Sequence, residues 1–254
     1  NSDLTLNAGS FQNVGGSVLH VGAGTFDIST ANLTNTGGNV VTRGGLTLTA
    51  DNWTNSSVIQ AGRLMVNVNT LNQTAGGQLL ASNSLVGNGG NWSNDGLIAS
   101  DGSLQLTLGG TYSGSGRASS QGTFGLSATQ VSLAIPGSLA GGGTTSIDVG
   151  QLINRGRITS VSDLNIKAGT VQNIGTLGAA EDLTITAQSL INDRDAADLN
   201  IRGFAFSGES STFNVNDFTN NYGEVVSLGG LTVAGFSAGT SAQSFRNTSG
   251  NIQS

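Results

Sequence analysis

The feature that most constrains the fold is a phrase of about twenty residues that recurs from one end of the chain to the other. One copy runs from Leu4 to Val18 and the next from Phe26 to Val40; in each, alternating apolar residues lead to an apolar residue two before an Asn, then Gly-Gly. A period of this kind makes one supersecondary unit stack on copies of itself. Most of the chain is therefore expected to be scaffold, with specific chemistry where the phrase breaks.

The opening of each copy predicts a β-strand. Residues 46–50, 164–168 and 183–187 alternate apolar and polar side chains, the period-two pattern of a strand with one buried face. We expect three short strands and three turns in each copy. The apolar residues that mark the expected starts are Leu4, Phe26, Leu46, Leu64, Leu85, Leu104, Phe124, Ile147, Leu164, Leu183, Phe213 and Leu231.

Equivalent residues at this spacing predict an all-β fold, a parallel β-helix of about twelve coils of roughly 20 residues, each about 4.8 Å from the next. A right-handed coil is expected because parallel crossovers are overwhelmingly right-handed. A sandwich or barrel also has short alternating strands but does not need matched residues in every copy. We expect one domain over residues 1–254, with an insertion at 192–212. Because the chain opens inside a repeat, we expect it to be a segment of a longer filament.

The Asn of each copy predicts an internal ladder. Asn tolerates the tight backbone of a corner, and its side chain can satisfy backbone groups that a turn leaves unpaired. Stacked in register, Asn side chains can also hydrogen-bond to one another. The expected ladder comprises Asn13, Asn35, Asn55, Asn94, Asn154, Asn173, Asn192, Asn220 and Asn247.

Composition argues against several functional classes. Charged residues make up only 9% of the chain, the net charge is −6 and Cys is absent. This balance disfavours nucleic acid and anionic lipid as partners, and thiolate metal sites are excluded. No apolar run is long enough to span a membrane. We expect no metal, no cofactor and no enzymatic activity; His20 is expected to be a solvated edge residue rather than a triad member, and Trp53 and Trp92 to be core residues rather than sugar platforms.

The insertion at 192–212 is the best place to seek a partner. Three carboxylates within six residues, Asp193, Asp195 and Asp198, suggest either a Ca²⁺ site or, as we favour, solvated acids. The two Phe side chains suggest either an exposed anchor on a loop or packing against the core. The candidate binding residues are Arg194, Asp195, Phe204 and Phe206.

The repeated phrase Leu-x-Leu-x-Ala, then an apolar residue, Asn, Gly-Gly and Val or Ile resembles the haemagglutinin repeats of filamentous haemagglutinin and of contact-dependent growth inhibition effectors. The resemblance implies a Gram-negative exoprotein exported by an outer-membrane two-partner transporter and displayed as a β-helical shaft at the cell surface. The secretion domain of that family carries Asn-Pro motifs. Here the single Pro follows Ile135, so this segment does not resemble that domain.

Three functions follow. The first is a structural and adhesive segment that extends and presents a binding or toxin-delivery tip. The second is the receptor-binding region of a growth-inhibition effector, with its specificity at about Gly178 to Gly230, that recognises an outer-membrane component of a target cell. The expected partner is a receptor, protein or glycan, on a target-cell or host surface. The third is a polysaccharide-degrading enzyme, which sparse charge disfavours. Exposed strands at both ends of a stack predict end-to-end association of the isolated fragment.

Overall fold

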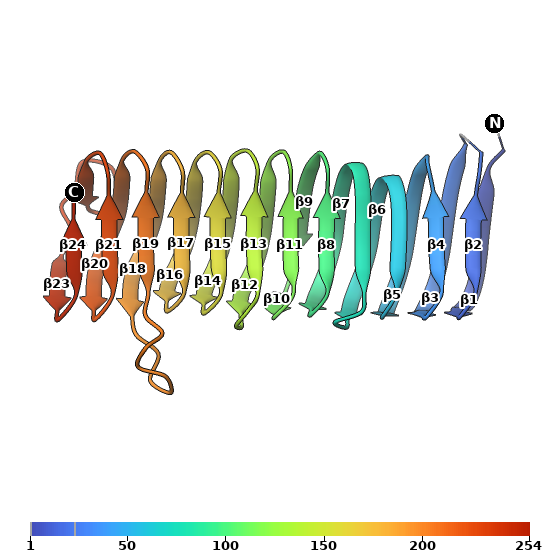
Figure 1. Cartoon of the computed structure of the whole chain (residues 1–254), viewed down its shortest axis with the longest axis horizontal. Coiled ribbons are helices and arrows are strands. Elements are labelled where there is room, and N and C mark those ends of the chain that lie inside the picture. Colours follow the sequence, from blue (N-terminus) through green and yellow to red (C-terminus); the bar gives the residue numbers. More distant parts are fainter. Residues whose placement is uncertain (1, 23) are drawn as a thin grey trace. The chain divides into compact units, whose positions relative to one another are not determined.

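The computed structural model describes residues 2–22 and 24–254, which form strands and turns with no helix among them. It therefore contains no helix that could cross a membrane in the described part of the chain. The chain divides into two compact units, the first ending at Thr123 and the second beginning at Phe124. Figure 1 labels most of the strands within each unit. Whether residues 1–254 form one domain remains a prediction.

The described residues of the first unit form eleven strands. Their bounds are β1 Leu4–Val14, β2 Ser17–His20, β3 Thr25–Thr36, β4 Asn39–Thr42, β5 Gly45–Asn55, β6 Val58–Gln73, β7 Gln78–Asn94, β8 Leu97–Ser100, β9 Ser103–Leu108, β10 Thr111–Gly114 and β11 Arg117–Ser120.

The second unit contains the remaining strands. Their bounds are β12 Phe124–Leu133, β13 Ser138–Gly141, β14 Thr145–Asn154, β15 Arg157–Ser160, β16 Leu164–Asn173, β17 Thr176–Ala179, β18 Leu183–Asp193, β19 Phe204–Ser207, β20 Ser211–Asn221, β21 Glu224–Ser227, β22 Leu231–Ala234, β23 Ser244–Thr248 and β24 Asn251–Gln253.

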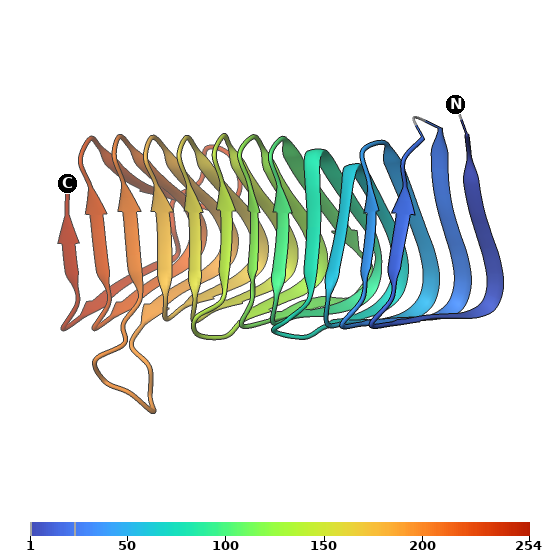
Figure 2. The same ribbon diagram turned by 45° about the vertical axis from the view of Figure 1, so that its right-hand side comes forward.

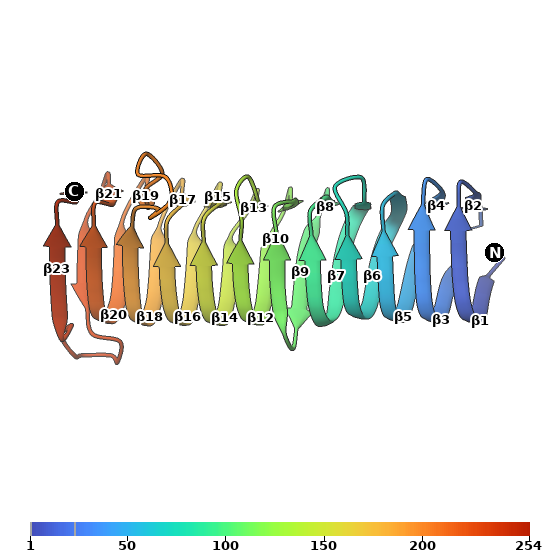
Figure 3. The same cartoon turned by 90° about the horizontal axis from the view of Figure 1, so that it is seen from below.

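Strands pair in parallel with the equivalent strands of the turns before and after them. Ile147 of β14 lies opposite Ile166 of β16, and Ile166 lies opposite Ile185 of β18. Figure 3 shows β14, β16, β18 and β20 side by side, with the segment before β23 looping away from them. The predicted all-β parallel solenoid, of about twelve turns in all, is confirmed.

Each turn generally has two strands rather than the three expected. The first two predicted strands are one longer strand that bends at a corner, and the register continues across the bend: Val149 pairs with Ala168 and Gln151 with Thr170. At that corner a Cβ on Gly169 would lie 2.7 Å from the carbonyl oxygen of Gly150. The lack of a side chain at Gly169 therefore allows successive coils to approach closely at this corner.

Two expected coil starts are wrong by two residues. Phe124 pairs with Thr145 rather than Ile147, and Leu183 pairs with Ser211 rather than Phe213. Thr145 and Ser211 are buried where other coils have a large apolar side chain. Their hydroxyl groups have internal partners: Thr145 Oγ1 donates to the Thr159 carbonyl at 3.1 Å, and Ser211 Oγ lies 2.8 Å from Ser207 Oγ.

The core contains both tryptophans, as expected, since Trp53 and Trp92 are each only 1% exposed. Trp92 Nε1 donates to the Val68 carbonyl at 2.8 Å, whereas Trp53 Nε1 has no hydrogen-bond partner in the described part of the chain. A Cβ at Gly87 would lie 2.3 Å from the Trp92 ring, so the absence of a side chain there makes room for the indole.

The expectation that His20 is solvated is wrong. Its side chain is buried, with Nδ1 3.1 Å from Thr42 Oγ1 and Nε2 2.8 Å from the Ser2 carbonyl. His20 occupies the corner position at which the next turn has Thr42. A polar side chain is satisfied at this corner by its neighbours, so His20 is a structural residue.

Candidate binding site at the inserted loop

A column of side-chain amides runs inside the first unit where each long strand ends. Asn13 Nδ2 donates to Asn35 Oδ1 at 2.9 Å, and Asn35 Nδ2 donates to Asn55 Oδ1 at 3.1 Å. The other N–H of an amide can reach a backbone carbonyl, as when Asn13 Nδ2 donates to the Asn39 carbonyl at 3.1 Å. Buried amides joined in this way rigidify a core, because few of their donors and acceptors lack a partner.

Two members of this column, Gln73 and Tyr112, were not predicted from the sequence. Gln73 accepts from Asn55 at 3.0 Å and donates to Asn94 at 2.9 Å; Asn94 then donates to the Tyr112 hydroxyl at 3.0 Å. Leu71 two residues before Gln73 was the available signal, since it repeats the apolar-x-amide pattern. Tyr112 pairs with Trp92, so its ring fills the apolar position and its hydroxyl the amide position. Burial raises the pKa of the Tyr112 phenol.

The second unit has its own amide column. Asn154 donates to Asn173, Asn173 to Asn192 and Asn192 to Asn220, each at 2.8 Å, and Asn220 donates to Asn247 at 2.9 Å. The first four are buried, and Asn247 is exposed. All nine expected Asn residues therefore lie in one of the two columns.

The inserted loop is shorter than expected. In the preceding coil a single residue and a Gly follow the ladder Asn, giving Asn173-Ile174-Gly175-Thr176; in the inserted coil, residues 194–202 interrupt the same pattern between Asp193 and Gly203. The Gly203 N–H donates to the Asp193 carbonyl at 2.6 Å, which closes the base of the loop. Figure 2 shows this orange segment projecting from the stacked strands between β18 and β19.

The loop folds back over earlier turns of the second unit. Asp195, which is 2% exposed, pairs with the Arg155 guanidinium, 40 residues earlier in the chain. Its Oδ1 accepts the Ala197 N–H at 2.8 Å. This hydrogen bond and the Arg155 charge hold the pKa of the Asp195 carboxyl below its ordinary value of 3.8, although burial acts in the opposite direction. Ionised Asp195 therefore fixes the loop to the coil that carries Arg155.

The other candidate residues have separate positions. Arg194 lies over the Tyr222 ring, 3.7 Å from its centroid. Phe204 and Phe206 lie in β19 rather than on the loop, and both are half-buried on its outer face with ring centroids 6.1 Å apart. Neither Phe side chain is therefore an anchor on the inserted loop, and neither is fully buried in the core.

The insertion's acids do not gather. Asp193 accepts from Asn221 at 2.8 Å, Asp195 pairs with Arg155, and Asp198 accepts from the Asn200 side chain at 3.1 Å. The described residues contain no cluster of three His, Cys, Asp or Glu side chains suited to a metal ion.

Between the loop and the turns beneath it lies a pocket of about 400 Å³, which we call the loop groove. Its polar lining includes Arg155, Arg157, Asn200 and Arg202. Its apolar lining consists of Ile135, Pro136, Ile174 and Ile201.

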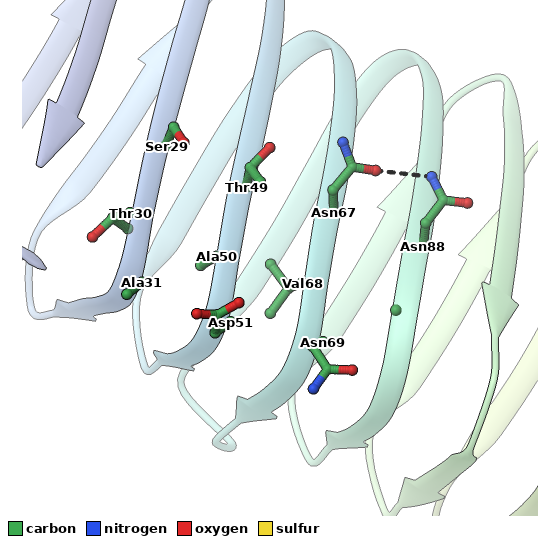
Figure 4. A pocket seen from close by; sticks show the side chains of 11 residues that line it. Ser29, Thr30, Ala31, Thr49, Ala50, Asp51, Asn67, Val68, Asn69 and Asn88 are labelled. Carbon is green, nitrogen blue, oxygen red and sulfur yellow. Dashed lines mark hydrogen bonds between the residues drawn. The ribbon is translucent and has the colours of Figure 1, made fainter. Parts of the chain in front are cut away.

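A second pocket, of about 520 Å³, lies in the first unit and is shown in Figure 4. Ser29, Thr49, Asn67 and Asn88 occupy matched positions of successive strands along it. Asn88 Nδ2 donates to Asn67 Oδ1 at 2.9 Å. Hydroxyl and amide groups of this kind can bind a hydroxylated ligand, but no aromatic ring lines the pocket to stack on a sugar.

Comparison with known proteins agrees with this architecture. The haemagglutinin repeat model matches residues 1–37, 21–61, 59–111, 99–173, 161–203 and 195–253. A relative named deoxyribonuclease CdiA, from Dickeya dadantii strain 3937, is 24% identical over 269 residues. That alignment covers 89% of this chain but only 8% of the relative. No solved structure matches. The chain therefore belongs to the haemagglutinin-repeat family, as a repeat segment of a secreted two-partner filament protein.

Proposed function

We propose that the chain is a structural and adhesive segment that extends a cell-surface filament and presents a binding or toxin-delivery tip. The observation that carries this proposal is the in-register stacking of coils around continuous amide columns, exemplified by Asn154, Asn173 and Asn192. Each coil adds about 4.8 Å while its backbone groups pair with neighbouring coils. The repeats of a CdiA relative support the toxin-delivery form of this role.

Removing whole coils from the parent protein tests the shaft role. Leu46, Leu64 and Leu85 occupy equivalent positions, so deletion of residues 46–84 joins Gly45 to Leu85 and preserves the register. We expect this variant to fold, reach the cell surface and keep attachment, with a shorter reach in electron micrographs. Deletion of residues 46–74 is the control, because it breaks the register and should prevent folding. A folded, exported 46–84 deletion that loses all attachment would contradict a purely geometric role.

The inserted loop favours a second role, recognition of an outer-membrane component of a target cell. It is a projecting segment held in one conformation by the Arg155–Asp195 pair, and binding residues are often found on loops positioned by a rigid scaffold. Deletion of residues 194–202 leaves Asn192-Asp193-Gly203-Phe204, the regular turn of the preceding coil. We expect the deletion to keep the solenoid and abolish retention on target cells. Unchanged retention would leave only the shaft role.

A further inference from the structure

The loop groove has both positively charged and apolar lining residues, in a chain that contains few charged residues of either sign. The whole sequence has only nine Lys and Arg residues, and three arginines line this one pocket. No acidic residue is among those that line it. The groove is therefore a local positive site on a chain whose net charge is −6.

Two of the three guanidinium groups are available to a ligand. Arg155 is paired with Asp195. Arg157 and Arg202 are exposed, and neither side chain forms a hydrogen bond or ion pair with any described residue. Guanidinium groups bind carboxylates through two parallel hydrogen bonds, so the free pair selects for an anion.

The apolar lining residues of the groove favour a ligand that carries an aliphatic group next to its anionic group. Ile135, which is 49% exposed, and Pro136 lie on a turn before β13, and Ile174 and Ile201 face the same pocket from other segments. No aromatic side chain lines the groove, whereas sugars are commonly held against aromatic faces. A volume of about 400 Å³ holds a few side chains rather than a large glycan.

We propose that the loop groove binds an acidic peptide segment, with a carboxylate at Arg157 and Arg202 and an adjacent aliphatic side chain against Ile135, Ile174 and Ile201. This inference deepens the second role above and rests on it for the source of the peptide, a protein on the target-cell surface. The Arg155–Asp195 pair positions the loop and leaves the other two arginines free to bind.

The test begins with selection of a phage-displayed library of random nonapeptides on the immobilised 254-residue chain. Enriched peptides are synthesised with fluorescein, and their affinities are measured by fluorescence anisotropy. We expect enriched peptides to contain Asp or Glu beside Ile, Leu or Val, and R157Q/R202Q to weaken their binding at least about tenfold. The matched control is R43Q/R63Q, which removes two exposed arginines from the first unit and should leave affinity unchanged.

In the peptide experiment, the proposal would be overturned by no enrichment, by enrichment without acidic residues, or by equal binding by R157Q/R202Q and wild type. A parallel arm with purified lipopolysaccharide and an array of anionic glycans tests the alternative source of negative charge. Preferential, Arg157-dependent binding in that arm would replace the peptide with a glycan.

A cell-retention assay separates this proposal from the receptor role itself. If target cells are retained equally by wild type and R157Q/R202Q, the receptor role stands and the peptide groove is wrong. If peptides bind through the two arginines but cells are not retained, the groove stands and the receptor role fails.

Discussion

Replacing Asn173 with Ala tests the contribution of the amide column. Asn173 is 0% exposed; it accepts from Asn154 and donates to Asn192, both at 2.8 Å. In the variant, Asn154 keeps its bond to the Thr176 carbonyl, but Asn192 Oδ1 loses the Asn173 amide, its one side-chain donor among the described residues. An orphaned buried oxygen costs about 1–3 kcal/mol, and loss of packing adds about 1 kcal/mol. We expect a total of about 2–4 kcal/mol.

The assay is native-state hydrogen exchange, because solenoids open segment by segment and a single unfolding midpoint would average over coils. Peptides covering β16 and β18 should lose about 2–4 kcal/mol of opening free energy, while peptides from the first unit stay unchanged. The control is Asn165→Ala, which removes an exposed amide from the same strand and should change stability by less than about 0.5 kcal/mol. A loss for Asn173→Ala no larger than that of the control would refute the reasoning.

The other predictions concern the core, the loop and the chain ends. Trp92→Phe should destabilise the chain by about 1–3 kcal/mol more than Trp53→Phe, because only the former leaves the Val68 carbonyl without its indole donor; equal denaturation shifts would contradict this. Because the folded pKa of Asp195 is lowered, its support of the loop should be complete above pH 3.8 and lost as pH falls through that lowered pKa; intrinsic-rate-corrected exchange of the Ala197 amide should show the loss, and D195N should show no such pH step. Since β1 and β24 each pair with one other strand among the described residues, the 254-residue chain should associate end to end; a concentration-independent monomer in sedimentation velocity would count against this.

The repeat allowed much of the fold to be predicted, because a buried position in a stack is constrained by the same position in the next coil. For this reason, the recurrence of Asn13, Asn35 and Asn55 at matched positions was enough to predict the amide column. The wrong coil starts arose where a polar residue occupies a core position that is apolar in other coils. Thr145 and Ser211 fill core positions with internally bonded hydroxyls, and these polar residues hid the true coil starts.

The candidate site was less predictable than the fold. Sequence marked the break in the repeat and the charged residues in it, but the partner of Asp195 lies 40 residues away in another coil. Nothing local connects Arg155 with Asp195, or Pro136 with Arg202. Their proximity follows from stacking turns in one column and folding a loop over that column, which the pattern of a single repeat does not encode.

The most direct test of the stacked solenoid is an NMR measurement of contacts between side-chain amides in an Asn-labelled chain. We expect Nδ2 protons of Asn154, Asn173 and Asn192 to be protected from solvent and to show through-hydrogen-bond couplings to the Cγ of the next Asn in the column. Freely exchanging amides without these couplings would contradict the register on which the fold, the loop and the groove all depend.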